Sequence, residues 1–282
     1  MSPSPAGPVL ITGCSTGIGR STAERLLKRG ATVWASARRR ESLRKLEDLG
    51  AHVAVLDVTD ADNCESVVQR IIDTHGPIGA LVNNAGYSES GPIELVGDEA
   101  ARNQFETNVF APMRLARLVL PSMREVGRGR IVNVSSMGGR FTFPAGGWYH
   151  ASKYALESLS DALRFEVAPF GIQVVLVEPG PVATEFGGTA LASESIAIDG
   201  ENPYADLIHA LNLAYGSAYK STKIGGPISA DRVARVIDKA ITKKQPRTRY
   251  PVGAMARGLI TTRRLLPDRA WDAFVGRTFR LP

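Results

Sequence analysis

Short runs of β-branched residues alternate with longer stretches whose apolar residues recur at helical spacing. The predicted strands are Val9–Thr12, Ala31–Ser36, His52–Asp57, Ala80–Asn83, Arg130–Ser135 and Ile172–Glu178. The predicted helices between them are Ile18–Arg29, Glu41–Leu49, Ala61–His75, Glu99–Arg124 and Tyr149–Ala168. Parallel strands need long crossovers, usually helices, and the runs VAVL and IQVVLV are apolar on both sides. We therefore predict an α/β fold with one doubly wound parallel sheet and helices on both faces.

The pattern changes after Glu178, where residues 185–228 are richer in Gly, Ser and Ala and have weaker periodicity. Ligands of open parallel sheets bind beyond the carboxyl ends of the strands, so this insertion is expected to form a lid over a substrate. The whole chain, 1–282, is then a single domain with a core (7–184), the lid (185–228) and a C-terminal part (229–282). The C-terminal part should contain a helix at Ala230–Thr242, a last strand in the TRYPV segment and two short helices separated at Pro267.

Composition argues against several classes of protein. Cys14 and Cys64 form no CxxC pair, so a disulfide framework is not expected and a reducing cytoplasm is favoured. The first residues lack the pattern of a signal peptide, and no apolar stretch approaches the roughly 20 residues that span a bilayer. His52, His75 and His209 show no metal-ligand spacing, so no metal is expected.

The net charge of +6 is concentrated at the C-terminal end, where ten Lys and Arg face two Asp from Lys243 onward. No nucleic-acid motif accompanies this basic region, so nucleic acid is not an expected partner. We favour a solvated helical face with salt bridges, and the alternative is peripheral contact with an acidic membrane surface.

A glycine-rich turn, Thr12-Gly13-Cys14-Ser15-Thr16-Gly17-Ile18-Gly19, lies between the first predicted strand and the first predicted helix. Glycines let the backbone approach a pyrophosphate, while the helix N-terminus supplies free N–H groups and partial positive charge. This strand–turn–helix context is the one that a dinucleotide motif requires, so the sheet is expected to be of the Rossmann type. A turn without a ligand is the alternative.

The spacing is TGxxxGxG rather than GxGxxG, and here the chain resembles the short-chain dehydrogenase/reductase family. Further matches follow in the family's order: Asn83-Asn84-Ala85-Gly86, Asn108, Ser136, Tyr149-x-x-x-Lys153 and Pro179-Gly180-x-Val182-x-Thr184. They cover well over half of the chain. The segment around Tyr149 and the basic C-terminal region most resemble bacterial relatives of hydroxysteroid and retinol dehydrogenases.

The resemblance implies a nicotinamide dinucleotide cofactor. Asp57, with the Val58 backbone, would hold the adenine edge, while Val182 and Thr184 would meet the nicotinamide carboxamide. The expected cofactor-binding residues are Gly13, Ser15, Thr16, Gly17, Ile18, Gly19, Arg38, Asp57, Val58, Asn84, Ala85, Gly86, Tyr149, Lys153, Pro179, Gly180, Val182 and Thr184. The alternative for Asp57 is that it only caps its own loop.

The end of the second predicted strand distinguishes NAD from NADP. An acidic residue there binds the ribose 2′-hydroxyl of NAD, whereas an arginine accepts the 2′-phosphate of NADP. Here Ala37 takes the place of the acid and Arg38 follows, with two more arginines after it. We favour NADP(H), with NAD(H) as the alternative, although the glycine-rich turn lacks the basic residue of many NADP-dependent members. The alternative without a function is that the three arginines are only the solvated start of a helix.

Tyr149 and Lys153 are four residues apart at a helix start and share one face. A free tyrosine has a pKa near 10, and a nearby ammonium favours the phenolate and lowers that pKa, as proton transfer requires. A second YxxxK match, Tyr219 to Lys223, has no preceding strand and no serine at the family's spacing, so it receives no role.

The resemblance adds Ser136, thirteen residues before Tyr149, as hydrogen-bond donor to the substrate carbonyl, with Ser135 as the competitor. Asn108 would hold a water near Lys153 that relays protons, or it is merely a polar residue on a helix surface. His150 adjoins Tyr149 but should point to another side of the helix and be structural.

The expected function is an NADP(H)-dependent oxidoreductase that interconverts a secondary alcohol and a ketone, with Tyr149 as proton donor and acceptor. A lipophilic substrate is expected because of the apolar residues that the lid supplies: Phe186, Leu191, Ile196, Ile198, Tyr204, Leu207, Ile208, Leu211, Leu213 and Tyr215. Phe141, Phe143 and Trp148 are expected to add an aromatic wall between Ser136 and Tyr149. The alternative is that these side chains only pack the lid onto the domain.

The family resemblance implies a homo-oligomer that pairs through the helices Glu99–Arg124 and Tyr149–Ala168. An NAD-preferring enzyme and an inactive cofactor sensor are the competing functions.

Overall fold

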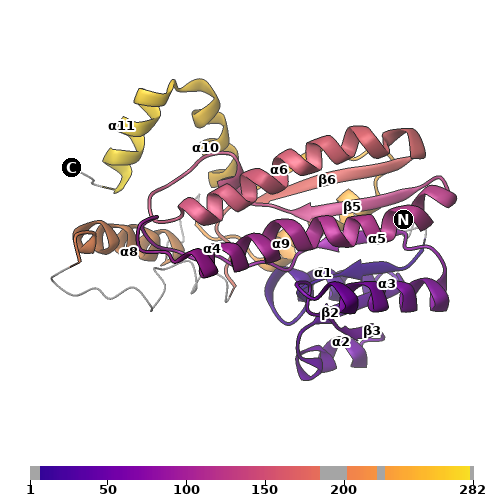
Figure 1. Ribbon diagram of the computed structural model, residues 1–282. Coiled ribbons are helices and arrows are strands. Elements are labelled where there is room, and N and C mark those ends of the chain that lie inside the picture. The colour runs from indigo at the N-terminus through magenta and orange to yellow at the C-terminus, as the bar shows by residue number, and fades with distance from the viewer. Residues whose placement is uncertain (1–6, 185–201, 221–225, 280–282) are drawn as a thin grey trace.

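The computed structural model describes residues 7–184, 202–220 and 226–279. Seven parallel strands form one sheet in the order β3-β2-β1-β4-β5-β6-β7 (Figure 1). The strands are β1 (Val9–Ile11), β2 (Val33–Ala37), β3 (His52–Val55), β4 (Ala80–Asn83), β5 (Gly129–Val134), β6 (Ile172–Pro179) and β7 (Arg249–Val252). The strand order reverses between β1 and β4, and a ligand crevice is expected there. The predicted doubly wound sheet is confirmed, and the expected strand in TRYPV is β7, paired with β6.

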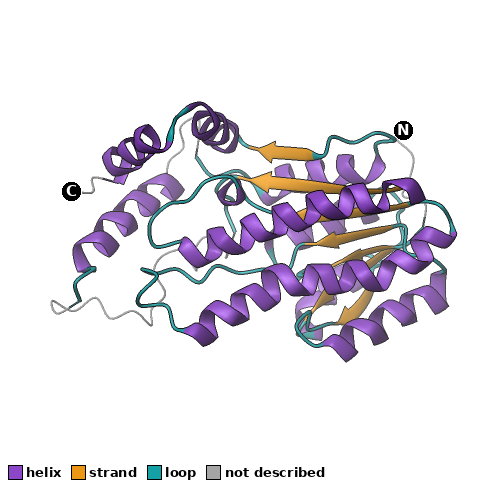
Figure 2. Ribbon diagram, turned by 45° about the horizontal axis from the view of Figure 1, so that its top comes forward, coloured by secondary structure: helices purple, strands orange, loops and turns teal. Residues whose placement is uncertain are grey.

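Helices cover both faces of the sheet (Figure 2). One face carries α1 (Gly17–Leu27), α2 (Arg44–Asp48) with the 3-10 turn Arg40–Leu43 before it, and α9 (Ala230–Thr242). The other carries α3 (Ala61–His75), α5 (Ala111–Glu125) and α6 (Gly147–Val167), which a 3-10 turn, Ala168–Phe170, joins to β6. Strand side chains alternate between the two cores, so Val9 and Ile11 pack into the first and Leu10 into the second.

The predicted helix Glu99–Arg124 is not uniform. It consists of α4 (Asp98–Phe105), a π-helical segment at Glu106–Phe110, and α5. Pro112 has no N–H to donate to the Asn108 carbonyl four residues earlier, which is the local reason for departing from α-helical pairing there. The expectation of one regular helix was therefore wrong at the turn that carries Asn108.

At one end of the molecule lie α8 (Ala205–Lys220), α10 (Ala254–Leu265) and α11 (Asp268–Phe279) (Figure 1). Their side chains contribute to a third apolar cluster. Its buried members are Phe141, Phe143, Leu211, Ile260, Trp271, Val275 and Phe279. Pro267 separates α10 from α11, as expected. Of the predicted lid, α8 is described, whereas Phe186, Leu191, Ile196, Ile198 and Lys223 lie outside the described residues.

Candidate active site

A cavity of about 1450 Å³ opens at the carboxyl ends of the strands and runs from the glycine-rich turn to α11. It is lined by every expected cofactor-binding residue except Gly19, and by Ser136, Tyr149 and Lys153 among the expected catalytic residues. Gly19 instead supports the turn from behind. A Cβ at Gly19 would lie 2.3 Å from the Gly13 carbonyl oxygen, so only glycine fits there.

The glycine-rich turn is tied to the end of β4. The Asn84 side chain donates from Nδ2 to the Thr12 carbonyl at 2.8 Å, and the Thr12 hydroxyl accepts from the backbone N–H groups of Asn84 and Ala85. Beyond the turn, α1 begins without a side-chain cap at Thr16 and without an acidic residue in its first turn. An uncapped helix N-terminus facing the cavity suits the pyrophosphate of a dinucleotide.

The end of β2 presents Arg38 to the same cavity. Its side chain is exposed, and its positive charge acts on Asp57, which also lines the cavity. The Asp57 carboxylate accepts from the Thr59 hydroxyl at 2.7 Å and from the Thr59 backbone N–H at 3.0 Å. The loop cap, which was the alternative role for Asp57, is therefore present, while the expected contact with an adenine stays a prediction.

Lys153 lies below the Tyr149 ring on α6. Its ammonium Nζ donates to the Val134 carbonyl at 3.1 Å and is 5.9 Å from the centroid of that ring. Burial lowers the pKa of Lys153 from 10.5 to about 8, against the opposing charge of Glu157. The geometry therefore places a buried cation beside the tyrosine, where it favours the phenolate.

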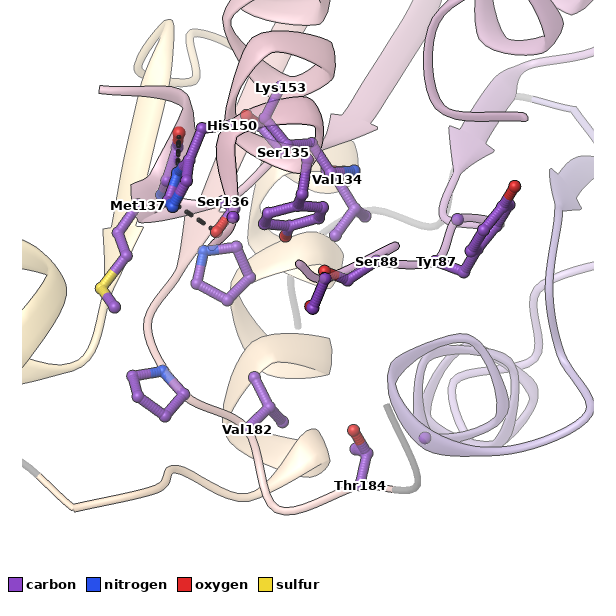
Figure 3. Close-up of a pocket in the computed structure, with 18 of the residues that line it drawn as sticks. Tyr87, Ser88, Val134, Ser135, Ser136, Met137, His150, Lys153, Val182 and Thr184 are labelled. Carbon is purple, nitrogen blue, oxygen red and sulfur yellow. Dashed lines mark hydrogen bonds between the residues drawn. The ribbon is translucent and has the colours of Figure 1, made fainter. Parts of the chain in front are cut away.

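Ser136 is better placed than Ser135 to meet a ligand. The Ser136 oxygen accepts a hydrogen bond from the Gly138 backbone N–H at 3.0 Å, which leaves the hydroxyl proton available to a ligand. Ser135 is buried and its hydroxyl has no hydrogen-bond partner among the described residues, whereas Ser136 is partly exposed. Figure 3 shows Ser136, His150 and Lys153 around the cavity wall.

Asn108 is buried, so the alternative of a polar residue on the helix surface is wrong. Its amide group accepts from the Tyr87 N–H at 3.1 Å, donates to the Tyr87 carbonyl at 2.9 Å, and donates to the Ser152 hydroxyl at 3.1 Å. The side chain thus joins the π-helical segment to the loop after β4 and to the Lys153 helix. It does not line the cavity, and its part in a proton relay stays a prediction.

A largely buried charged network lies beside the site, around Glu157 and Glu178, and the sequence did not predict it. Arg249 Nε is 2.9 Å from a Glu157 carboxylate oxygen and 3.4 Å from Glu178, while its Nη2 is 2.6 Å from Asp161. Arg140 bonds the same Glu178 oxygen at 2.9 Å. Burial, and then the negative charge of Glu178, raises the pKa of Glu157 from 4.5 to about 7.

This raised pKa predicts a pH-dependent stability. Folded Glu157 holds its proton at higher pH than unfolded Glu157, so its stabilisation is complete below about pH 4.5 and is lost as pH rises through 7. The free energy of unfolding should lose up to about 3 kcal/mol from this group across that window, at about 1.4 kcal/mol per pKa unit. Urea unfolding at several pH values should show a flatter pH profile for Glu157→Gln than for wild type.

Glu47→Gln is the matched control, because Glu47 pairs with Arg40 at the exposed surface. Its profile should follow wild type. Identical profiles for Glu157→Gln and wild type would exclude a titrating Glu157.

Residues of the C-terminal helices also line the cavity, which the sequence did not indicate: Met255, Leu259, Thr278 and Phe279. Tyr219 lies within α8, but no side-chain placement is described for it. Within the described ranges, no helix is long and apolar enough to cross a membrane, and no cluster of three potential metal ligands occurs.

The family model of the short chain dehydrogenases matches residues 8–195, most of the chain. The chain belongs to the short-chain dehydrogenase/reductase family. It is an oxidoreductase. Two similar members are an NADPH-dependent 3-dehydrocapnine reductase of Ornithobacterium rhinotracheale and a 3-ketodihydrosphingosine reductase of Bacteroides thetaiotaomicron, which are 35% and 36% identical. The alignments cover 93% and 92% of this chain, and 94% and 93% of those two proteins.

Solved structures of family members agree with the fold. A short-chain dehydrogenase from Streptomyces avermitilis is 34% identical, with a TM-score of 0.79 and coverage of 98% of this chain and 97% of that one. A second, from Burkholderia cenocepacia, was solved in complex with NADP and is 26% identical, with a TM-score of 0.73 and coverage of 95% and 97%. The glycine-rich turn, Tyr149 and Lys153 thus lie in a fold that this chain shares with solved structures of the family.

Proposed function

We propose that this oxidoreductase uses NADP(H) to interconvert a secondary alcohol and a ketone, with Tyr149 as the acid and base. The observation that carries the proposal is the convergence of Ser136, Tyr149 and Lys153 on one cavity with the glycine-rich turn and Arg38. An inactive cofactor sensor has no need of this constellation. The sharpest test is the Tyr149→Phe variant, which should lose turnover and keep its affinity for NADPH.

Each residue of the site has a defined task. The cofactor, when bound, supplies or accepts the hydride. Ser136 donates its hydroxyl proton to the substrate oxygen and aligns it, and Tyr149 gives that oxygen a proton in reduction and removes it in oxidation. Lys153 would hold the nicotinamide ribose, and its ammonium favours the phenolate of the tyrosine. A water held by the segment around Asn108 would return a proton to the site.

Preference for NADP(H) follows from the end of β2. Ala37 offers no carboxylate to a ribose 2′-hydroxyl, and Arg38 is exposed toward the cavity, where a guanidinium can bind a 2′-phosphate. The NADPH dependence of the Ornithobacterium relative and the NADP complex of the Burkholderia relative support the same choice.

The substrate is proposed to be lipophilic. The cavity beyond Tyr149 is lined by Phe141, Phe143, Leu211, Leu213, Met255, Leu259 and Phe279. Trp148, by contrast, lies in a separate groove beside Phe105 and Phe110, so its expected place in the aromatic wall is wrong. Apolar walls with a few fixed polar groups are typical of pockets for small molecules.

A ketone series of rising apolar size tests this proposal. Each buried methylene contributes up to about 0.8 kcal/mol, so kcat/KM with NADPH should rise by up to about fourfold per methylene until the cavity is filled. A polyhydroxylated ketone of matched length is the control and should be a poor substrate. A flat or falling trend from the smallest ketones onward would contradict a lipophilic substrate.

A homo-oligomer that pairs through α4, α5 and α6 is also proposed. Large apolar side chains are exposed on this side, among them Phe110 and Phe165, the latter 74% exposed. Sedimentation at micromolar concentration should show a species larger than the 30.2 kDa chain. A single monomeric species would exclude it.

A further inference from the structure

His150, the residue after Tyr149, is built into the wall that carries Ser136. Its imidazole is buried, and its ring nitrogens face two different backbone groups: Nδ1 is 2.8 Å from the Gly138 carbonyl oxygen, and Nε2 is 3.3 Å from the Phe143 backbone nitrogen. The imidazole packs against the rings of Phe141, Phe143 and Tyr149.

These two bonds determine the tautomer. A backbone N–H can only donate, so Nε2 must offer its lone pair to Phe143, and the proton of the neutral ring must lie on Nδ1 and be donated to Gly138. Burial lowers the pKa of His150, against the opposing hydrogen bond to Gly138. Burial is the larger of the two causes, and it favours a neutral ring that acts as donor at one end and acceptor at the other.

The backbone is shaped to receive this ring. A Cβ at Gly138 would lie 2.6 Å from His150 Nδ1, and one at Gly146 would lie 2.9 Å from Cδ2. Side chains at either position would displace the imidazole. Gly138 and Gly146, which stand before and after Phe141 and Phe143, therefore leave room for the histidine to bond to the backbone of the segment between them.

Gly138 connects His150 to Ser136 through two hydrogen bonds. Its carbonyl accepts from His150, and its N–H donates to the Ser136 oxygen at 3.0 Å. Ser136 and His150 lie close together on one wall of the cavity (Figure 3). Holding Gly138 in place thus directs the Ser136 hydroxyl proton toward a ligand.

We propose that His150 is a positioning residue for the reaction, which through Gly138 orients the Ser136 hydroxyl and through Phe143 holds the aromatic wall of the substrate cavity. The inference rests on the proposed role of Ser136. It assigns the two ring nitrogens to two separable effects, because Nδ1 serves the catalytic serine and Nε2 serves the wall.

Two substitutions separate these effects. In His150→Gln, the amide lies near the position of Nε2 and keeps an acceptor for Phe143 but loses the bond to Gly138. In His150→Asn, the amide lies near the position of Nδ1, so the bond to Gly138 is kept and the bond to Phe143 is lost. Small misplacements in an active site cost up to about a hundredfold. We expect His150→Gln to lower kcat by tenfold or more, and His150→Asn to retain kcat within about threefold while raising KM for apolar ketones.

A double-mutant cycle with Ser136→Ala tests whether His150 acts through the serine. The double variant His150→Gln with Ser136→Ala should have the same kcat as Ser136→Ala alone. Losses that multiply would overturn the inference while leaving the role of Ser136 intact. A Ser136→Ala variant with unchanged kcat would instead overturn the proposed function. His52→Gln, at an exposed histidine on β3, is the matched control and should leave kcat unchanged.

A spectroscopic measurement on the wild-type enzyme tests the assigned hydrogen bonds of His150 without measuring activity. Nitrogen NMR of the histidine side chains at pH 7 should show His150 neutral with its proton on Nδ1. A proton on Nε2, or a charged ring, would overturn the assigned bonds even if a variant fails to fold.

Discussion

Turnover should fall by about a thousandfold or more in Tyr149→Phe, while NADPH binding stays close to wild type. General acid–base groups contribute roughly 10²–10⁴-fold, and this substitution removes only the titrating hydroxyl. The ring is retained, so the packing above Lys153 and the cavity wall should be preserved. Consumption of NADPH with a ketone, followed at the nicotinamide absorbance, gives the rate, and quenching of protein fluorescence gives the affinity.

Tyr219→Phe is the matched control, because Tyr219 belongs to the second YxxxK match of the chain. It should be close to silent. If Tyr219→Phe lost activity and Tyr149→Phe kept it, the site would have been assigned to the wrong tyrosine.

Affinity for NADPH should fall about tenfold to a hundredfold in Arg38→Ala, with little change for NADH. Hydrogen bonds to charged groups are worth roughly 1.5–3 kcal/mol, and only NADPH carries the 2′-phosphate that Arg38 is placed to receive. Titration calorimetry with both cofactors measures the two affinities. In the wild type, NADPH should bind more tightly than NADH.

Arg39→Ala is the control for charge alone. Arg39 is exposed next to Arg38 but does not line the cavity, so its removal should change NADPH affinity far less. Equal affinities of the wild-type enzyme for NADPH and NADH would contradict the proposed preference. Equal losses of NADPH affinity in Arg38→Ala and Arg39→Ala would mean that positive charge in general, rather than a contact of Arg38, favours NADPH.

Patterns among neighbouring residues were enough to predict the sheet, the glycine-rich turn and the pair Tyr149 and Lys153. These features are local, since strand periodicity, the turn after β1 and a four-residue spacing on one helix are written in neighbouring residues. The predicted strands accordingly agree with β1 to β7 to within two residues. Pro112 is a local cause of the π-helical segment at Asn108. The apolar periodicity nevertheless continues across this segment, and for that reason the sequence indicated one regular helix.

The way in which distant segments complete the site depends on tertiary packing. Glu157 and Arg249 are 92 residues apart, and the charge network that they form with Glu178 depends on β7 joining the sheet beside β6. Phe279 reaches the substrate cavity because α11 packs on the loop of Phe141 and Phe143. No pattern in the sequence encodes such contacts, because a residue's neighbours in space are set by the packing of whole helices and strands against one another.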